Sequence, residues 1–230
     1  MKPSALRKCA FVLPAAALAL ALAGCKTEGG PEAPAKVQKA AQTPAAKVAT
    51  APAKAELPAG VRRPSAVGDK GVWKQDGKEV VWETVKLNGS IAEFHGPGGC
   101  KVVLDLSSYS PAWSWRDSSG STGSRKIEKH AGGLFPLAVG NTESWQFTGR
   151  NSKGKTWSNM RSCKVAGTAN VTVPAGNFDA YHVVCRENSA RYDYWFAPEL
   201  GFTVISSKAP LPGKKSSRYR RELIRIEPAA

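Results

Sequence analysis

The chain has 230 residues, and Lys and Arg outnumber Asp and Glu by 33 to 18, which gives a net charge of +15 at pH 7. A basic balance of this size favours anionic neighbours such as lipid headgroups, lipopolysaccharide or the cell wall. The apolar run from Ala10 to Ala23 is shorter than the roughly 20 residues that a membrane-spanning helix needs, so it is excluded as such a helix.

The N-terminal segment, residues 1–24, has the order of a secretory signal peptide: basic residues, then the apolar run, then small residues. The run ends in Leu22-Ala23-Gly24-Cys25, which resembles the bacterial lipobox. The resemblance implies cleavage before Cys25, diacylglycerol on its sulfur and a further acyl chain, such as palmitate, on its new amine. Lys26 follows instead of Asp, which in the sorting rule for such lipoproteins implies the outer membrane. The alternative is an ordinary signal peptide with an incidental cysteine.

Residues 25–66 are mainly Ala, Pro, Lys, Thr and Glu, and they contain no aromatic residue. Such a composition buries too little apolar surface to offset its conformational entropy, and its prolines interrupt any helix that the alanines favour. We therefore predict a disordered tether that lets the folded part of the chain stand clear of the lipid surface.

Residues 67–230 differ in composition, because all seven Trp residues lie here, and they suit one domain with a hydrophobic core. Short apolar alternations separated by turn residues predict an antiparallel all-β domain, built as a curved sheet, a barrel or a sandwich. Glu79–Leu87 runs into Asn88-Gly89, a strong hairpin signal, and Ser90–His95 is the expected return strand. Further strands are expected at residues 100–106, 142–148, 157–165, 192–196, 201–206 and 218–227.

The stretch VTVPAGNFDAYHVVC, residues 171–185, predicts a β-hairpin. Pro174 lacks the N–H group that a strand ladder needs, and Gly176 can adopt a positive φ. We expect a connection of roughly three to five residues, after which Tyr181, Val183 and Cys185 alternate as a half-buried strand.

This hairpin and the later stretch YWFAPELGFTVI, residues 194–205, resemble a signature of uncharacterised bacterial cell-envelope proteins. In that family a V-P-A-G-x-F-D hairpin precedes a Y-W-x-A-P-E-L-G strand-turn-strand, and the LFPL stretch at residues 134–137 also fits the pattern. The resemblance covers roughly the last half of the domain. It implies a fold and a compartment, but no activity.

The cysteines predict one disulfide. Cys25 carries lipid in this interpretation, so the exported domain retains Cys100, Cys163 and Cys185, and its oxidising compartment favours a bridge. Cys163 and Cys185 lie at similar distances on either side of the predicted turn and are the expected pair. Pairing of Cys100 with Cys185 is the alternative, because connectivity does not follow from sequence alone.

We predict no metal site, no cofactor and no enzymatic activity. His182 and Cys185 lie three residues apart on a strand and point to opposite faces, and no CxxC or HxxxH spacing supplies further ligands. The motif G-x-S-x-G is absent from the sequence. Asp179, Asp193 and Glu199 are the candidates for a glycosidase-like carboxylate pair, but Asp179 suits the turn and Glu199 lies in a corner.

Two segments carry candidate binding residues. The loop from Ser107 to Ser124 holds Tyr109, Trp113 and Trp115, which would grip sugar rings if exposed and would otherwise cover the core. The basic run Lys214–Arg221 is expected to be a solvated edge strand whose charges discourage aggregation.

These observations predict a lipid-anchored protein of the bacterial outer membrane whose domain faces the periplasm and acts by non-enzymatic binding or by structural support. The expected partners are the membrane, through the lipid anchor, and a cell-wall glycan, an anionic lipid or an envelope protein. Nucleic acid is not expected, because the domain is exported. The alternatives are a carrier of lipid or lipoprotein in an apolar β cavity and a hydrolase of cell wall or lipid.

Overall fold

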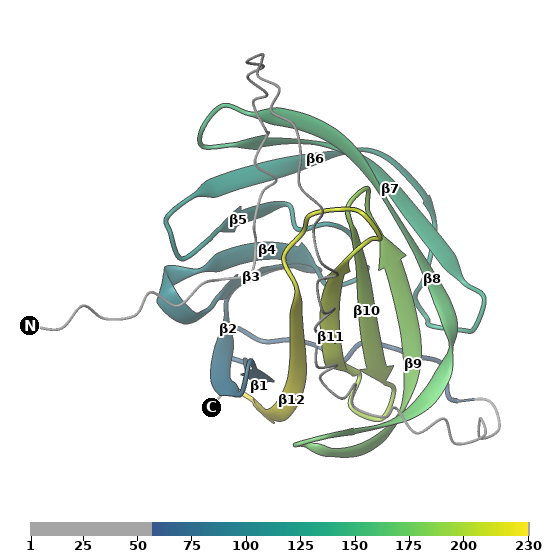
Figure 1. Ribbon diagram of the computed structural model, residues 1–230. Helices are drawn as coiled ribbons and strands as arrows, with labels where there is room; N and C mark the ends of the chain where they lie inside the picture. The colour runs from purple at the N-terminus through teal and green to yellow at the C-terminus, as the bar shows by residue number, and fades with distance from the viewer. Residues whose placement is uncertain (1–56, 230) are drawn as a thin grey trace, which may run out of the picture.

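The computed structural model describes residues 57–229, so the predicted signal peptide, Cys25 and most of the predicted tether lie outside the described residues. The described chain forms twelve β-strands and one short 3-10 helix (Figure 1). The elements are β1 (Lys70–Gln75), β2 (Lys78–Asn88), β3 (Ile91–His95), η1 (Pro97–Gly99), β4 (Lys101–Asp105), β5 (Ser114–Arg116), β6 (Thr122–Gly132), β7 (Thr142–Asn151), β8 (Thr156–Val173), β9 (Gly176–Arg186), β10 (Ala190–Ala197), β11 (Phe202–Pro210) and β12 (Tyr219–Glu227).

The strands close into one antiparallel barrel. Each strand pairs with its neighbour in sequence, and β1 pairs with β12 to complete the circle, with Lys70 opposite Glu227. This arrangement confirms the all-β prediction and selects the barrel among the three predicted architectures. The predicted edge strand at the end of the chain is wrong, because β12 has hydrogen-bonded neighbours on both sides, β11 and β1.

The predicted hairpin signals form the expected turns. Asn88 pairs with Ile91 across a turn in which Gly89 has a φ of 56°. Val173 pairs with Gly176, so the connection between β8 and β9 is Pro174 and Ala175 alone, shorter than predicted. Gly176 has a φ of 137°, a conformation that favours glycine.

Strand register separates an inner from an outer face. In β7, Trp145 and Phe147 are buried, while Gln146 between them is exposed, as expected for a strand with one face turned inward. Residues far apart in the sequence meet on this inner face. Tyr109 lies in the connection after β4, and its carbonyl oxygen accepts a hydrogen bond from Nη1 of Arg161 in β8 at 3.0 Å.

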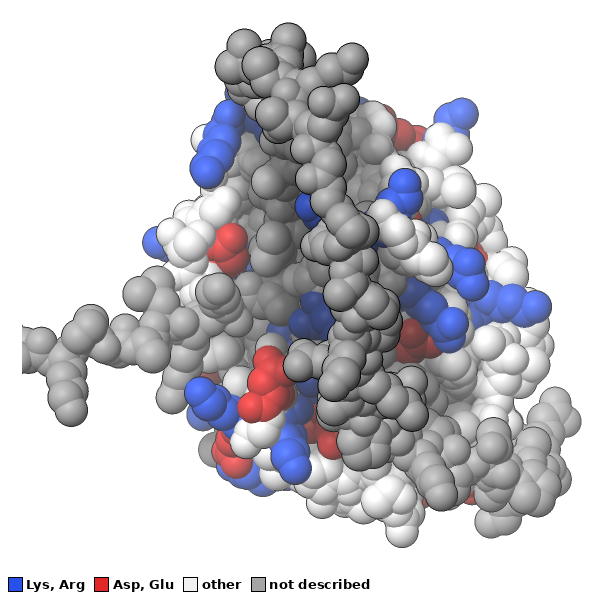
Figure 2. Space-filling view, in the orientation of Figure 1, with Lys and Arg blue, Asp and Glu red and all other residues white. Residues whose placement is uncertain are grey.

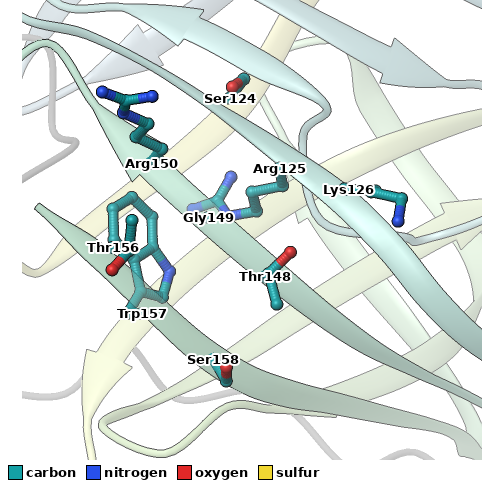
Figure 3. A pocket seen from close by; sticks show the side chains of 9 residues that line it. All are labelled: Ser124, Arg125, Lys126, Thr148, Gly149, Arg150, Thr156, Trp157 and Ser158. Atoms are coloured by element: carbon teal, nitrogen blue, oxygen red, sulfur yellow. The ribbon is translucent and has the colours of Figure 1, made fainter. Parts of the chain in front are cut away.

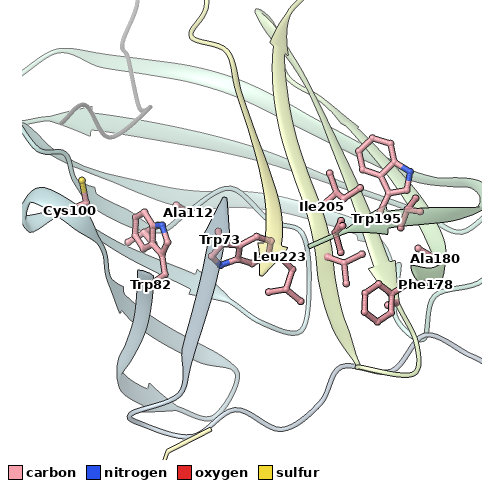
Figure 4. Close-up of a cluster of buried hydrophobic side chains, with 14 residues drawn as sticks. Trp73, Trp82, Cys100, Ala112, Phe178, Ala180, Trp195, Ile205 and Leu223 are labelled. Atoms are coloured by element: carbon pink, nitrogen blue, oxygen red, sulfur yellow. The ribbon is translucent and has the colours of Figure 1, made fainter. Parts of the chain in front are cut away.

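The hydrophobic core consists of two clusters. The first joins Trp73 and Leu223, which pair across β1 and β12, with Phe178 and Trp195 from β9 and β10 (Figure 4). The N–H of Ala175 donates to the Leu223 carbonyl oxygen at 3.0 Å, so the tip of the β8–β9 hairpin reaches β12. The second cluster contains Tyr109, Leu134, Leu137, Trp145, Cys163, Val165, Tyr181, Val183, Cys185, Ala190, Tyr192 and Phe196.

The segment before β1 packs on the barrel. Gly60 and Leu137 exchange two backbone hydrogen bonds, and the Tyr181 hydroxyl donates to the Leu57 carbonyl oxygen at 2.9 Å. The guanidinium of Arg62 lies 4.8 Å from the centre of the Tyr109 ring. Contacts with the domain therefore begin before the predicted boundary at Val67.

Candidate functional site

A shallow trench crosses the outer face of β6, β7 and β8 (Figure 3). Two rows of polar side chains border it, and we call these six residues and the space between them the outer trench: Ser124, Arg150 and Thr156 in one row, and Lys126, Thr148 and Ser158 in the other. Between the rows lie Arg125, Gly149 and Trp157, and by strand alternation the Arg125 and Trp157 side chains point to the inner face. The trench encloses about 460 Å³.

The two cations of the outer trench differ in their partners. Lys126 lies 3.2 Å from Glu128, and Glu128 also accepts a hydrogen bond from the Thr148 hydroxyl at 2.8 Å. The hydrogen bonds from Thr148 and Lys126 lower the pKa of Glu128, so this carboxylate stays ionised and offsets the lysine charge. Among the described residues, Arg150 forms no ion pair with a carboxylate.

The surface around the outer trench is basic. Lys153 and Lys155 lie in the turn between β7 and β8, next to Arg150, and the sequence from Ser144 to Phe178 contains no Asp or Glu. A separate depression of about 570 Å³ lies on β6 to β10, and its lining includes Lys164, Arg186 and Arg191 together with Glu143. Lys and Arg side chains gather over β7 and β8, the right side of Figure 2.

A buried ion pair lies on the inner face. Arg161 donates from Nε to Oε1 of Glu187 at 2.8 Å and from Nη1 to the carbonyl oxygens of Tyr109 and Ser110. Burial opposes ionisation of both groups, but their mutual attraction outweighs it, so the pKa of Arg161 is raised and that of Glu187 is lowered. The guanidinium also lies 4.5 Å from the centre of the Tyr192 ring.

The three aromatic side chains that were candidates either for sugar binding or for covering the core do not share one exposed surface. Tyr109 is 6% exposed, and its hydroxyl lies 3.0 Å from the Thr203 hydroxyl inside the barrel. Trp115 is 5% exposed and packs 5.9 Å from Trp157, centre to centre. Trp113 is 40% exposed. Two of the three therefore contribute to the core, and Trp113 alone presents its ring to solvent.

Each histidine lies beside a carboxylate. His182 lies 2.8 Å from Asp193 and stacks on Trp195 at 4.6 Å between ring centres, so two neighbours hold its ring in place. His130 lies 2.7 Å from Glu143, and His95 lies 2.8 Å from Glu93. Among residues 57–229, no three His, Cys, Asp or Glu side chains are placed to hold a metal ion.

The predicted carboxylate candidates have separate surroundings. Asp193 accepts hydrogen bonds from Arg191 and lies beside His182. Asp179 accepts one from the Asn170 side chain at 3.1 Å, and Glu199 is exposed in the β10–β11 turn. The bond between Asp179 and Asn170 stays within the β8–β9 hairpin, whereas the partners of Asp193 lie in β9 and β10.

The predicted disulfide is present. Cys163 and Cys185 are register partners in β8 and β9, and a bond joins their Sγ atoms. This excludes the alternative pairing of Cys100 with Cys185. Cys100 is buried in the first hydrophobic cluster, after η1.

The outer trench and the inner cations were not predicted from the sequence. β6 was not predicted, because its inner positions include Arg125 and its outer positions are polar, so no apolar alternation marks it. The stretch without acidic residues from Ser144 to Phe178 is the signal that points to the basic surface.

Among the described residues, 57–229, no helix is both long and apolar enough to span a membrane. No protein-family model matches this chain, and no curated protein matches it. The solved structures that are similar to it include the following two. One is the hypothetical lipoprotein YmcC from Escherichia coli K12, with 7% sequence identity, 74% of this chain and 91% of that chain covered, and a TM-score of 0.44. The other is a Bacteroides fragilis NCTC 9343 protein described as exported with a YmcC-like fold, with 15% identity, 73% and 99% coverage, and a TM-score of 0.35.

Proposed function

We propose that this chain is a lipid-anchored protein of the bacterial cell envelope that binds an anionic glycan without catalysis, through the outer trench. The anchor is the predicted lipid on Cys25, and the tether lets the barrel reach away from the membrane. The outer trench, with hydroxyl groups along both rows and an arginine that has no carboxylate partner among residues 57–229, is the observation that carries the proposal.

The chemistry of the trench suits a sugar chain that carries carboxylates. Ser and Thr hydroxyls both donate and accept hydrogen bonds, as sugar hydroxyls do. The planar guanidinium of Arg150 can donate two parallel hydrogen bonds to a carboxylate. The lysines in the β7–β8 turn add positive potential, which increases the association rate at low salt and is screened at high salt.

The residues that line the outer trench support binding more than catalysis. The lining contains no Asp, Glu, His or Cys, so it offers no acid-base pair to a bound glycan. Transport of a wholly apolar ligand inside the barrel is a less favoured function, because Arg125, Arg161 and Lys208 lie among the aromatic rings of the inner face.

Calorimetric titration of the full mature chain with oligogalacturonate tests the proposal, with dextran as the neutral comparison. We expect the anionic chain alone to bind, and Kd to rise with salt. The double variant R150Q/K153Q should raise Kd by roughly fivefold or more, whereas K74Q/K78Q, which removes the same charge from β1 and β2, should not. Equal loss in both variants, or equal binding of dextran, would contradict the proposal.

A further inference from the structure

The inner face of the barrel carries more positive than negative charge. Arg125 of β6, Arg161 of β8 and Lys208 of β11 lie near one another there, and Glu187 is the single described carboxylate that forms an ion pair with any of them. Arg161 and Lys208 are each 7% exposed. Three cations and one carboxylate leave two positive charges without a counter-charge in a largely dry environment.

The two cations without an ion pair have only neutral partners among the described residues. Nη1 of Arg125 donates to the Ala112 carbonyl oxygen at 2.9 Å, while its Nε is buried and has no hydrogen-bond acceptor. Nζ of Lys208 donates to the Ser217 hydroxyl at 3.1 Å. A buried charge that lacks a counter-ion is costly, so this arrangement is poorly balanced as a purely structural one.

The pKa shifts of Lys208 and Arg125 also indicate that these buried cations lack a sufficient counter-charge. Burial lowers the pKa of Lys208, attraction to Glu187 opposes the effect, and the nearby guanidinium groups of Arg161 and Arg125 lower it further. Burial likewise lowers the pKa of Arg125, which Arg161 also lowers. The three cations are therefore close enough to repel one another, and a bound anion would relieve the repulsion.

Aromatic side chains surround the cluster. Arg161 and Lys208 both lie over the ring of Tyr192, at 4.5 Å and 5.6 Å from its centre, and Arg125 lies 4.4 Å from the centre of the Trp115 ring. Barrel diameter grows with strand number, and about eight strands already enclose a space that side chains fill. A barrel of twelve strands is wider, and Figure 2 shows Lys and Arg side chains deep in the hollow at the centre of the view.

We propose that the interior of the barrel binds a phosphate group between Arg125, Arg161 and Lys208, beside the ring of Tyr192. A doubly charged phosphate matches the two positive charges that Glu187 leaves unbalanced, and guanidinium groups suit its oxygens. The phosphate is either free or part of a lipid headgroup whose apolar part contacts the aromatic wall. This site is distinct from the outer trench, since its residues lie on the opposite face of the sheet.

Titration of the full mature chain with inorganic phosphate tests the site, with chloride at matched ionic strength as the comparison and thermal unfolding and calorimetry as the readouts. We expect a saturable rise in Tm and one bound phosphate per chain. Dihexanoyl phosphatidic acid is titrated in parallel: tighter binding than inorganic phosphate identifies a lipid headgroup, and equal or weaker binding identifies free phosphate.

The variant Lys208→Met should raise the Kd for phosphate about tenfold or more, because a charge-assisted hydrogen bond is lost. Lys208→Arg, which retains the charge, should restore binding, and Lys74→Met, on the surface of β1, should leave it unchanged. The R150Q/K153Q variant should bind phosphate normally, and K208M should bind oligogalacturonate normally. Loss of binding at one site should therefore leave binding at the other site unchanged. Absence of a saturable response of the wild-type chain to both probes would overturn the inference, whether or not the variants fold.

Discussion

Cys163 and Cys185 are register partners in β8 and β9, with their Cα atoms 4.0 Å apart, and their disulfide links strands that already pair. The bridge closes the loop that contains the Pro174–Ala175 turn, over a sequence separation of 22 residues. The disulfide therefore stabilises the fold in addition to the hydrogen bonds between β8 and β9, mainly because it restricts the conformations of the unfolded chain.

We predict that the double variant C163A/C185A lowers the free energy of unfolding by about 3 kcal/mol, as expected for a loop of this length. Urea unfolding under oxidising conditions measures the difference. Because both sulfurs are removed together, no new thiol is created. An unfolding free energy equal to that of the wild type would show that the bridge is dispensable for stability.

Trp115 in β5 and Trp113 just before this strand should differ in how much they contribute to stability. Trp115→Ala should lower the free energy of unfolding by about 3–5 kcal/mol, because a buried indole is replaced by a cavity. Trp113→Ala should change it by less than about 1 kcal/mol, because this ring is already half in solvent. Urea titrations of both variants measure the contrast, and similar losses would contradict the assigned burial.

Gly123 leaves room for a tryptophan on the inner face. A Cβ atom at this position would overlap the Trp115 indole, so Gly123→Ala should lower the free energy of unfolding by about 1–3 kcal/mol through overpacking. Gly167 is the matched control: a Cβ there meets no atom within 4 Å, so Gly167→Ala should change stability by less than about 0.5 kcal/mol. Thermal unfolding compares the two, and equal shifts in Tm would refute the packing argument.

Asp193 should contribute a pH-dependent stability. Burial raises its pKa, but hydrogen bonds from His182 and Arg191 outweigh burial and hold the pKa below its ordinary value. A carboxyl with a lowered folded-state pKa stabilises the fold above its unfolded-state pKa, and this stability is lost as pH falls through the folded-state pKa. Asp193→Asn should therefore cost about 1–3 kcal/mol at pH 7 and progressively less below about pH 4.

Urea unfolding at neutral and acidic pH measures this dependence. Asp179→Asn is the control, because that carboxylate accepts a hydrogen bond from an exposed asparagine side chain instead of a cation. If the cost of Asp193→Asn were the same at both pH values, the ionised form of Asp193 would not be the stabilising species.

The predicted lipid anchor has a direct test. Cys25→Ser should release the protein from the membrane fraction into the soluble periplasm, because Cys25 is the one predicted attachment site of the acyl chains. Cys9→Ser, within the predicted signal peptide, should leave the distribution unchanged. Fractionation followed by immunoblotting measures both, and a Cys25→Ser protein that stays with the membranes would contradict lipidation at this position.

The parts of the fold that follow from local pattern were predictable. Strands with apolar alternation, such as β7, and turns with Asn-Gly or Pro-Ala-Gly were found from the sequence because their signals lie within a few residues. Closure of the barrel was not predictable, since it depends on the pairing of the first and last strands. Arg125 and Lys208 were missed for another reason, because a lysine or arginine in a strand ordinarily indicates the solvent side.

Closure through β1 and β12 has a consequence for how the chain folds. The eleven other strand contacts of the barrel join strands that are consecutive in sequence, whereas the β1–β12 contact joins the two ends of the described domain. A contact of such long sequence separation forms slowly, and synthesis delivers the N-terminal strand first. Until residues 219–227 arrive, β1 has a partner on one side only, so a chain that loses its last strand keeps an open seam along the barrel.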